Sequence, residues 1–234
     1  MNSAPAPLAH VALLDNAIWH ALSTEQAYLA QGNDLARRFP REISPFAAIR
    51  DTSPEAYQAL AELLDGDTVA VSFDIQPNLP AGWATRFSVD AHQMVFEGST
   101  PVEPKQKFRR LTQEDVPVML ALTKLTDPGP FLPRTIEFGS YFGIFDGNAL
   151  VAMAGERIRL TGFTEVSAVC THPDYTGRGY GSALMSVVMA GIMRRGETPF
   201  LHVRVGNPAQ GLYEKLGFKV RAPLHLTVIN YAPA

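Results

Sequence analysis

Three glycines and one arginine gather in a short segment late in the chain, and their chemistry suits a phosphate group. The segment Thr176–Ser182 reads Thr-Gly-Arg-Gly-Tyr-Gly-Ser and stands just before a stretch with helical periodicity. A helix N-terminus attracts anions through its unpaired N–H groups and its dipole. Glycines let a phosphate reach the backbone, and Arg178 adds a fixed cation. The segment therefore predicts an anion site, although a tight turn without a ligand is the simpler interpretation of an isolated glycine cluster.

Two common phosphate-binding motifs do not fit this segment. A Walker loop requires Lys and then Ser or Thr after its last glycine, whereas Gly181 is followed by Ser182 and Ala183. A dinucleotide-binding fingerprint carries a third glycine three residues after its second and belongs to the first strand of its domain. Here Ser182 stands at that position and the segment lies late in the chain. An unrelated phosphate-binding protein is thus disfavoured.

The elements that must position this segment follow from periodicity. Residues 165–171 predict a strand that leads into it, and an apolar stripe predicts a long helix from Gly179 to Arg195, ended by Gly196. A capping box at 112–115 and a hairpin turn at 146–148 mark neighbouring elements. Further strands are expected at 108–111, 141–145, 149–160, 200–205 and 218–229, and helices at 112–125, 133–138 and 208–216. This order is typical of a mixed α/β fold.

A segment rich in proline and small residues, Gly98–Lys105, suggests a boundary between two domains. It separates an N-terminal α/β domain, 1–104, from a C-terminal domain, 105–234. In the first domain, Ser23 with Gln26 predicts a capping box for a helix through Gln31. A second helix is expected from Pro54 to a stop at Gly66, with strands at 68–75 and 91–97. No catalytic motif stands out in this part.

Composition excludes several function classes. The net charge of −3 lacks the basic excess that nucleic-acid binders usually carry. The single cysteine, Cys170, allows no internal disulfide, which fits a cytoplasmic setting. The N-terminus does not resemble a signal peptide, and the longest apolar stretch, 183–193, falls short of the roughly 20 residues that span a bilayer. His and acidic residues show no metal-ligand spacing, so we predict no metal, no membrane and no nucleic-acid partner.

Two segments in a fixed order resemble a known family. Val169–Leu184, which includes the glycine-rich turn, and Asn207–Phe218 are similar to two motifs of the GCN5-related N-acetyltransferases (GNAT), in particular of the glycine N-acyltransferase-like branch. The resemblance covers roughly residues 108–234 and implies a GNAT fold with acetyl-CoA, or another short acyl-CoA, as co-substrate. One position departs from the family pattern, because Thr176 stands where Gln or Arg is usual.

The resemblance also implies roles for individual residues. Backbone amides from Gly177 to Ser182 would hold the pyrophosphate, and the strand around Val169 would pair with the pantetheine arm. The Val169 N–H would polarise the thioester carbonyl, and Asn207 would contact the pantetheine arm or only cap its helix. The expected coenzyme-binding residues are Val169, Cys170, Thr171, Thr176, Gly177, Arg178, Gly179, Tyr180, Gly181, Ser182 and Asn207.

Acyl transfer to an amine requires a base for the amine and an acid for the departing thiolate. The resemblance makes Tyr213 the candidate general acid, with a packing aromatic as the alternative. Glu165 is the candidate base, directly or through water, and strand alternation puts it on the face of Val169. Glu156 is its rival, and His202 is interpreted as a core histidine. Cys170 faces the other way and is expected to pack in the core rather than to carry an acyl group.

The predicted function is the transfer of an acetyl or other short acyl group from acyl-CoA to a primary amine of a small molecule or peptide. The N-terminal domain would shape the acceptor pocket, since ligands often bind where domains meet. A catalytically weak acyl-CoA sensor remains the alternative. The acceptor and the oligomeric state, a homodimer included, stay open.

Overall fold

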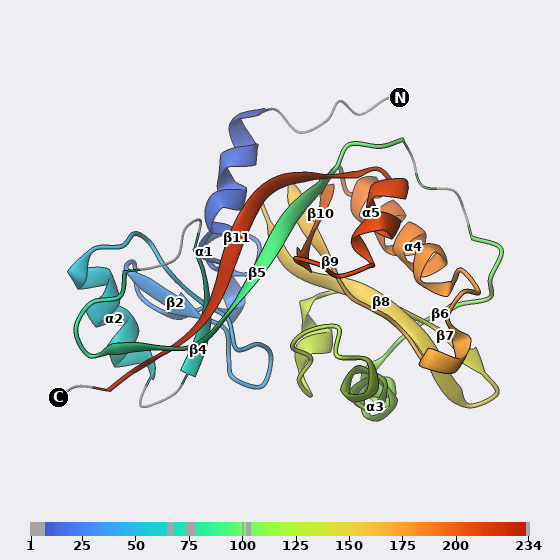
Figure 1. Cartoon of the computed structure of the whole chain (residues 1–234), viewed down its shortest axis with the longest axis horizontal. Helices are drawn as coiled ribbons and strands as arrows, with labels where there is room; N and C mark the ends of the chain where they lie inside the picture. The colour runs from blue at the N-terminus through green and yellow to red at the C-terminus, as the bar shows by residue number, and fades with distance from the viewer. Residues whose placement is uncertain (1–7, 65–67, 74–77, 100, 102–103, 233–234) are drawn as a thin grey trace.

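A mixed eight-stranded sheet forms the centre of the molecule (Figure 1). The structure is a computed structural model that describes residues 8–64, 68–73, 78–99, 101 and 104–232. Only β9 and β10 run parallel, whereas every other neighbouring pair in this sheet is antiparallel. In spatial order the strands are β4 (Thr68–Phe73), β11 (Phe218–Tyr231), β5 (Trp83–Phe96), β10 (Thr198–Arg204), β9 (Phe163–Thr171), β8 (Ala149–Leu160), β7 (Tyr141–Asp146) and β6 (Arg109–Arg110).

Helices cover both faces of this sheet. On one face α4 (Tyr180–Arg194) and α5 (Gln210–Lys215) bury an apolar core with side chains of β5, β8 and β10. On the other face α3 (Val116–Thr126) packs over β7, β8 and the end of β9. Short 3-10 turns complete this part: η3 (Gln113–Asp115), η4 (Thr135–Phe138) and η5 (Pro173–Tyr175). No helix in the described ranges is long and apolar enough to span a membrane.

The N-terminal elements close over the same face as α3. Residues of α1 share a core with Phe39, Ile158 and Phe200, so α1 packs directly on the central sheet. A small three-stranded sheet and one helix lie beside it, over β4 and β11 (Figure 1). The elements are η1 (Leu8–Asn16), α1 (Ala17–Ser23), η2 (Ala27–Leu29), β1 (Gln31–Gly32), β2 (Ala36–Arg38), β3 (Ala47–Ile49) and α2 (Pro54–Leu64).

The central sheet crosses the boundary expected at residue 104. Strand β5, which comes before that boundary, lies between β10 and β11, which come after it. Met94 of β5 is paired with Leu201 on one side and with Val220 on the other. Most of β5 from Ala84 to Asp90 is exposed, so its first half lacks the alternation of buried residues that marks a strand in sequence.

Most elements lie where the sequence predicts them, and the mixed α/β fold is confirmed. The capping box at Thr112–Asp115 and the helix start at Pro54 are present, whereas the predicted stop at Gly66 lies outside the described residues. The helix predicted from Ser23 to Gln31 is wrong, because α1 ends at Ser23. The Gln26 side chain is buried and bonds instead to the backbone of Arg157 and Arg159 in β8. Because the Gln26 side chain makes this tertiary contact, it is not available for the predicted capping box.

Candidate active site

Strands β9 and β10 part near the middle of the sheet. They are paired at only three positions, the last being Phe200 with Glu165, although both strands continue and are described throughout. Within β9, Ala168 adopts φ +52°, and the register with β8 shifts there. This bulge and the divergence leave the inner edge of β9 from Val166 to Thr171 without a neighbouring strand. An extended ligand can therefore hydrogen-bond to that edge.

The glycine-rich turn joins the end of β9 to α4. Gly177 and Gly179 both have φ +76°, a conformation that side chains rarely adopt, and the space above Gly177 is open. The first helical bond in this turn runs from the Ala183 N–H to the Gly179 carbonyl. The N–H groups of residues 180–182 thus precede the helical bonding and are oriented for an anion.

The remaining side chains of the turn fold back on the protein. The Arg178 guanidinium lies 4.5 Å from the centre of the Tyr175 ring and donates to the Asp174 carbonyl. The Thr176 hydroxyl donates to the Pro173 carbonyl at 2.9 Å. The position at which this sequence departs from the family pattern therefore stabilises the loop itself.

Helix α5 closes the gap from above. A side chain at Gly181 would meet Leu212 of α5 and Val169 and Thr171 of β9, each at 3.9 Å. The turn, the strand edge and α5 therefore converge, as a site for a coenzyme with a pyrophosphate and an extended arm requires. The Asn207 side chain accepts a hydrogen bond from the Ala209 N–H at 2.9 Å and so stabilises the turn that leads into α5, which begins at Gln210. The individual roles of these residues stay predictions.

Tyr213 is the buried residue of α5 and is 8% exposed. Its ring packs edge-on against Phe218, and none of the described residues hydrogen-bonds to its hydroxyl. Burial, together with the nearby Cys170, raises the pKa of Tyr213 to about 12, so the hydroxyl keeps its proton at neutral pH. Burial likewise raises the pKa of Cys170 to about 11, which keeps the thiol protonated and unreactive.

Glu165 lies on the opposite face of the sheet from α4. Val166 and Val169 pack with the α4 core, whereas Ala168 and Cys170 pack with the α3 core. The expectation that Glu165 and Val169 share a face is therefore wrong, because the bulge at Ala168 reverses the alternation. Cys170 does face away from Val169, as expected.

The Glu165 carboxylate is fully buried and is held by three strong contacts. Arg157 donates to its two oxygens at 2.8 and 2.6 Å, and His202 Nδ1 lies 2.8 Å from Oε1. Burial alone raises the pKa of this carboxyl, but Arg157 and His202 outweigh it and hold the pKa well below its usual range. Glu165 is therefore ionised at neutral pH.

His202 lies on β10, the strand next to β9, and connects Glu165 to further polar side chains, which together form a row. Its Nε2 lies 3.2 Å from the Gln93 amide nitrogen, which also donates to the Leu14 carbonyl. Arg221 donates to the Gln93 amide oxygen and thereby fixes the orientation of the amide. The Gln93 N–H then donates to Nε2, so the proton on His202 resides on Nδ1 and faces Glu165. The row crosses five adjacent strands: Arg157 (β8), Glu165 (β9), His202 (β10), Gln93 (β5) and Arg221 (β11).

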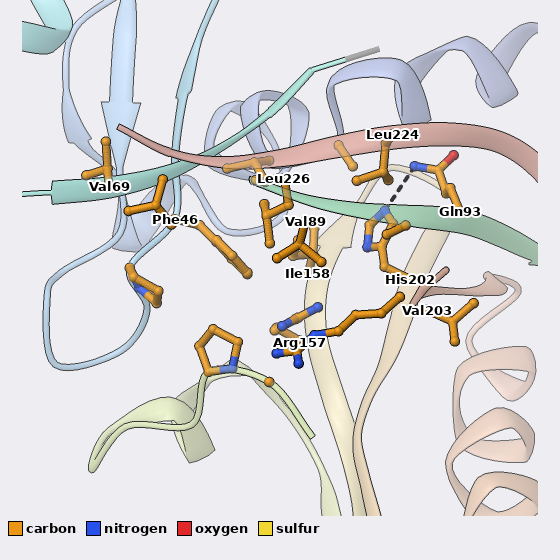
Figure 2. Close-up of a pocket in the computed structure, with 18 of the residues that line it drawn as sticks. Phe46, Val69, Val89, Gln93, Arg157, Ile158, His202, Val203, Leu224 and Leu226 are labelled. Carbon is orange, nitrogen blue, oxygen red and sulfur yellow. Dashed lines mark hydrogen bonds between the residues drawn. The ribbon is translucent and has the colours of Figure 1, made fainter. Parts of the chain in front are cut away.

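A pocket of about 380 Å³ lies above this row, between the N-terminal elements and the sheet (Figure 2). His202, Gln93 and Arg157 line it, whereas Glu165 lies behind them. Its other walls are mainly apolar and come from α1, the segment before β3, β5, β11 and the loop after α3. The volume lies in the range of small-molecule sites, roughly 300–1,000 Å³.

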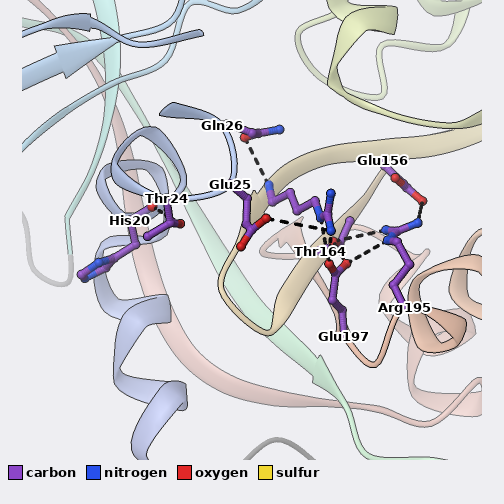
Figure 3. A network of polar contacts seen from close by, with 9 residues as sticks. His20, Thr24, Glu25, Gln26, Glu156, Thr164, Arg195 and Glu197 are labelled. Carbon is purple, nitrogen blue, oxygen red and sulfur yellow. Dashed lines mark hydrogen bonds and ion pairs between the residues drawn. The ribbon is translucent and has the colours of Figure 1, made fainter. Parts of the chain in front are cut away.

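Glu156, the rival base, belongs to a different cluster (Figure 3). It accepts from Arg195 at 3.1 Å, and Arg195 also pairs with Glu197, which holds Arg159 at 2.5 Å. Glu156 is not among the residues that line the pocket. This network ties the end of α4 to β8 and β9.

Sequence reasoning missed Gln93 and Arg157 and interpreted His202 as a core histidine. Each of the three occurs singly within a strand, so no local motif marks them. In the sequence, these residues stand out only as polar residues within apolar strands. Such residues point to a site only when the strand order shows that they lie side by side.

Comparison with known proteins agrees with this geometry. The profile of the FR47-like protein family matches residues 141–225. A GNAT-family protein from Novosphingobium aromaticivorans DSM 12444, assigned as an acetyltransferase, is 35% identical, with 94% of this chain and 98% of that chain covered and a TM-score of 0.87. No curated protein is significantly similar to the chain.

Two more distant structures share the fold alone. A GCN5-related N-acetyltransferase from Kribbella flavida is 14% identical, with 95% of this chain and 96% of that chain covered and a TM-score of 0.62. A GCN5-related N-acetyltransferase-like protein from Streptococcus suis is 12% identical, with 95% and 97% covered and a TM-score of 0.57. The glycine N-acyltransferase-like branch stays a prediction. With the parted strands and the glycine-rich turn, the relative at 35% identity shows that the chain belongs to the GNAT family of acyl-CoA-dependent N-acyltransferases, with acetyl-CoA as its co-substrate.

Proposed function

We propose that the enzyme transfers an acetyl group from acetyl-CoA to the primary amine of an acceptor bound in the pocket between the N-terminal elements and the sheet. One observation carries this proposal. His202 lies just beyond the last pair of β9 and β10, where the strands part, and it also lines the pocket. A coenzyme arm in the gap and an acceptor in the pocket would thus meet at His202.

The coenzyme site follows from the turn and the strand edge. Bound acetyl-CoA supplies an activated acyl group as a thioester. The N–H groups of residues 177–182 hold its pyrophosphate, and the backbone of residues 169–171 pairs with its extended arm. The Val169 N–H donates to the thioester carbonyl, whose oxygen gains charge as the amine attacks. The attack is direct, since Cys170 is protonated and faces away from Val169.

Tyr213 is the general acid in this proposal. Its raised pKa keeps the hydroxyl protonated, and its position on α5 near Cys170 of β9 would let it hold that proton for the departing sulfur. No described residue hydrogen-bonds to the hydroxyl, so it can turn toward the coenzyme without breaking an existing bond.

His202 and Glu165 act together on the amine. Glu165 was the base expected from the sequence, yet its oxygens are fully buried and already engaged. His202 is 19% exposed at its side chain and reaches the pocket. The amine takes the place of the Gln93 N–H at Nε2 and gives its proton to His202, while Glu165 orients the imidazole and stabilises its cation.

The test is a screen of primary amines with acetyl-CoA, in which release of free coenzyme thiol is measured. We expect acceptor-dependent thiol release and a product heavier by one acetyl group in mass spectrometry. Thiol release without acetylated product would indicate hydrolysis and contradict the proposal. Binding of acetyl-CoA with no transfer to any amine would favour a sensor instead.

A further inference from the structure

We infer that the acceptor is a small primary amine with an apolar body, a carboxylate close to the amine and no second positive charge, of which an apolar amino acid is the simplest example. This inference rests on the proposed function and defines the substrate class of the same pocket. It follows from the lining of the pocket, from the charges at its floor and from the spacing of two polar groups.

Most of the side chains in the walls of the pocket are apolar, which suits an acceptor with an apolar body. Phe46 of the N-terminal part lies close to Val89 of β5 and Leu226 of β11 (Figure 2). Ile18 of α1 also lines the pocket. Phe87, which is 58% exposed, lies at the β5 wall. An acceptor without an apolar body would leave these surfaces in water and gain little from binding.

The charges that line the pocket are of one sign. Among the described lining residues the charged side chains are Arg157 and Arg204, and no carboxylate reaches the surface of the pocket. Glu165 balances Arg157 but is fully buried behind it. Arg204 pairs with Asp127, which also lies outside the lining. A second ammonium group on the acceptor would therefore find guanidinium groups but no carboxylate at the surface of the pocket.

One nitrogen of the Arg157 guanidinium, Nη1, is available to donate a hydrogen bond to a ligand. Its Nε and Nη2 bind Glu165, and its guanidinium lies 4.9 Å from the centre of the Phe46 ring, whereas Nη1 has no hydrogen-bond partner among the described residues. A guanidinium at the wall of a pocket suits a carboxylate oxygen of the ligand.

The base and this donor are close together. His202 Nδ1 and Arg157 Nη2 both bind the same oxygen of Glu165, at 2.8 and 2.6 Å. The two side chains are therefore neighbours on the floor of the pocket, with His202 Nε2 and Arg157 Nη1 as the atoms that do not bind Glu165. One small acceptor can thus direct its amine to Nε2, its carboxylate to Nη1 and its apolar body to the walls.

The experiment compares kcat/KM for L-phenylalanine and L-leucine with three amines that each lack one feature. These are 2-phenylethylamine, which has no carboxylate, glycine, which has no apolar body, and spermidine, which carries further cations. We expect both apolar amino acids to exceed each of the three by roughly tenfold or more, the scale at which a pocket distinguishes such groups.

A charge placed in the wall gives a second measurement. Phe87→Asp should lower kcat/KM for L-phenylalanine and raise it for spermidine, because it adds a carboxylate to the pocket. The exposed position of Phe87 makes this change compatible with the fold. Tyr28→Asp is the matched control, since Tyr28 is 72% exposed and lies outside the lining, and it should change neither value.

Two failures can be told apart. If 2-phenylethylamine, glycine or spermidine equals L-phenylalanine as an acceptor, or if Phe87→Asp leaves the preference unchanged, the inferred class is wrong while the proposed acetyl transfer stands. If no amine is acetylated although acetyl-CoA binds, the proposed function itself fails and this inference fails with it.

Discussion

Burial and partners set the protonation of the individual residues proposed to move protons. The Tyr213 hydroxyl has a raised pKa because it is buried, and the Glu165 carboxyl has a lowered pKa because Arg157 and His202 outweigh its burial. At neutral pH one group therefore holds a proton and the other holds a charge. The proposed mechanism needs both states: a protonated acid, Tyr213, and an ionised carboxylate, Glu165, that supports the base His202.

Replacement of Tyr213 tests the acid. Tyr213→Phe removes the hydroxyl and keeps the ring against Phe218, so we expect kcat to fall by about a hundredfold or more, with the Kd for acetyl-CoA changed less than about twofold. Steady-state kinetics and calorimetry measure the two quantities. Tyr57→Phe, at a buried tyrosine in a separate core, should retain full activity. Unchanged turnover in Tyr213→Phe would remove the acid role.

Replacement of His202 tests the base. His202→Gln should lower kcat by about a hundredfold or more, because a glutamine side chain cannot take a proton from the amine, and it should change the Kd for acetyl-CoA less than about twofold. His225→Gln is the control, since His225 of β11 pairs with Asp90 of β5 and lies outside the pocket lining, and it should keep the native kcat. A His202→Gln variant with the native kcat would return the base role to Glu165.

Among the elements, the turn before α4 and the bulge in β9 contribute most to the proposed coenzyme site. The turn was recognisable from the sequence because its glycines, at every second position from 177 to 181, lie within one short segment. The bulge was not, because Ala168 resembles any small strand residue and its positive φ arises from the register with β8. Local chemistry therefore predicted the pyrophosphate end of the site, whereas sheet geometry determines the side to which Glu165 points.

A bulky acid in the turn should exclude the coenzyme. Gly179→Glu places a side chain and a negative charge where the pyrophosphate would lie, so we expect loss of acetyl-CoA binding in calorimetry with the fold retained in circular dichroism. Gly196→Glu is matched to it, because Gly196 has φ +77°, open space and a position at the far end of α4. Comparable loss in both variants would indicate a general effect of strain instead.

The capping box before α3 makes stability depend on pH. Hydrogen bonding from the Arg109 guanidinium, aided by the Thr112 N–H, lowers the pKa of Asp115 to about 2. A lowered folded-state pKa contributes stability above the ordinary pKa near 4, and that contribution is lost as the pH falls through about 2. Asp115→Asn should therefore reduce the free energy of unfolding by about 1 kcal/mol at pH 7, and the difference should shrink below pH 4.

Chemical denaturation at pH 7, 4 and 2.5 measures this dependence. Glu114→Gln in the same turn is the control, because Glu114 is exposed, and it should change the free energy by less than about 0.5 kcal/mol. A difference between Asp115→Asn and the native chain that stays constant with pH would exclude ionisation as its cause.

For the molecule as a whole, the long strands β5 and β11 join the two halves. Each has 14 residues, and together they extend from the small N-terminal sheet to the coenzyme gap (Figure 1). The sequence predicted two domains because the linker at Gly98–Lys105 is conspicuous. It could not show that the strand before this linker lies between two strands that follow it, since sheet order depends on contacts distant in sequence.

Truncation tests this shared architecture. Residues 105–234 alone lack β5, which separates β10 from β11, so we expect the fragment to lose the cooperative unfolding transition and the binding of acetyl-CoA. Calorimetric scans of the fragment and of the full chain make the comparison. Mixing with residues 1–104 should restore both properties in part. A fragment that unfolds cooperatively and binds acetyl-CoA would identify an independent catalytic domain.

The parting of β9 and β10 also bears on association between molecules. A strand edge without a partner is a template for another chain, and proteins usually cover such edges. Here the uncovered edge lies inside the sheet, where only a slender extended molecule can reach it. If the coenzyme arm lies along β9 as proposed, bound acetyl-CoA also covers this strand edge. The enzyme should then resist aggregation best while its co-substrate is bound.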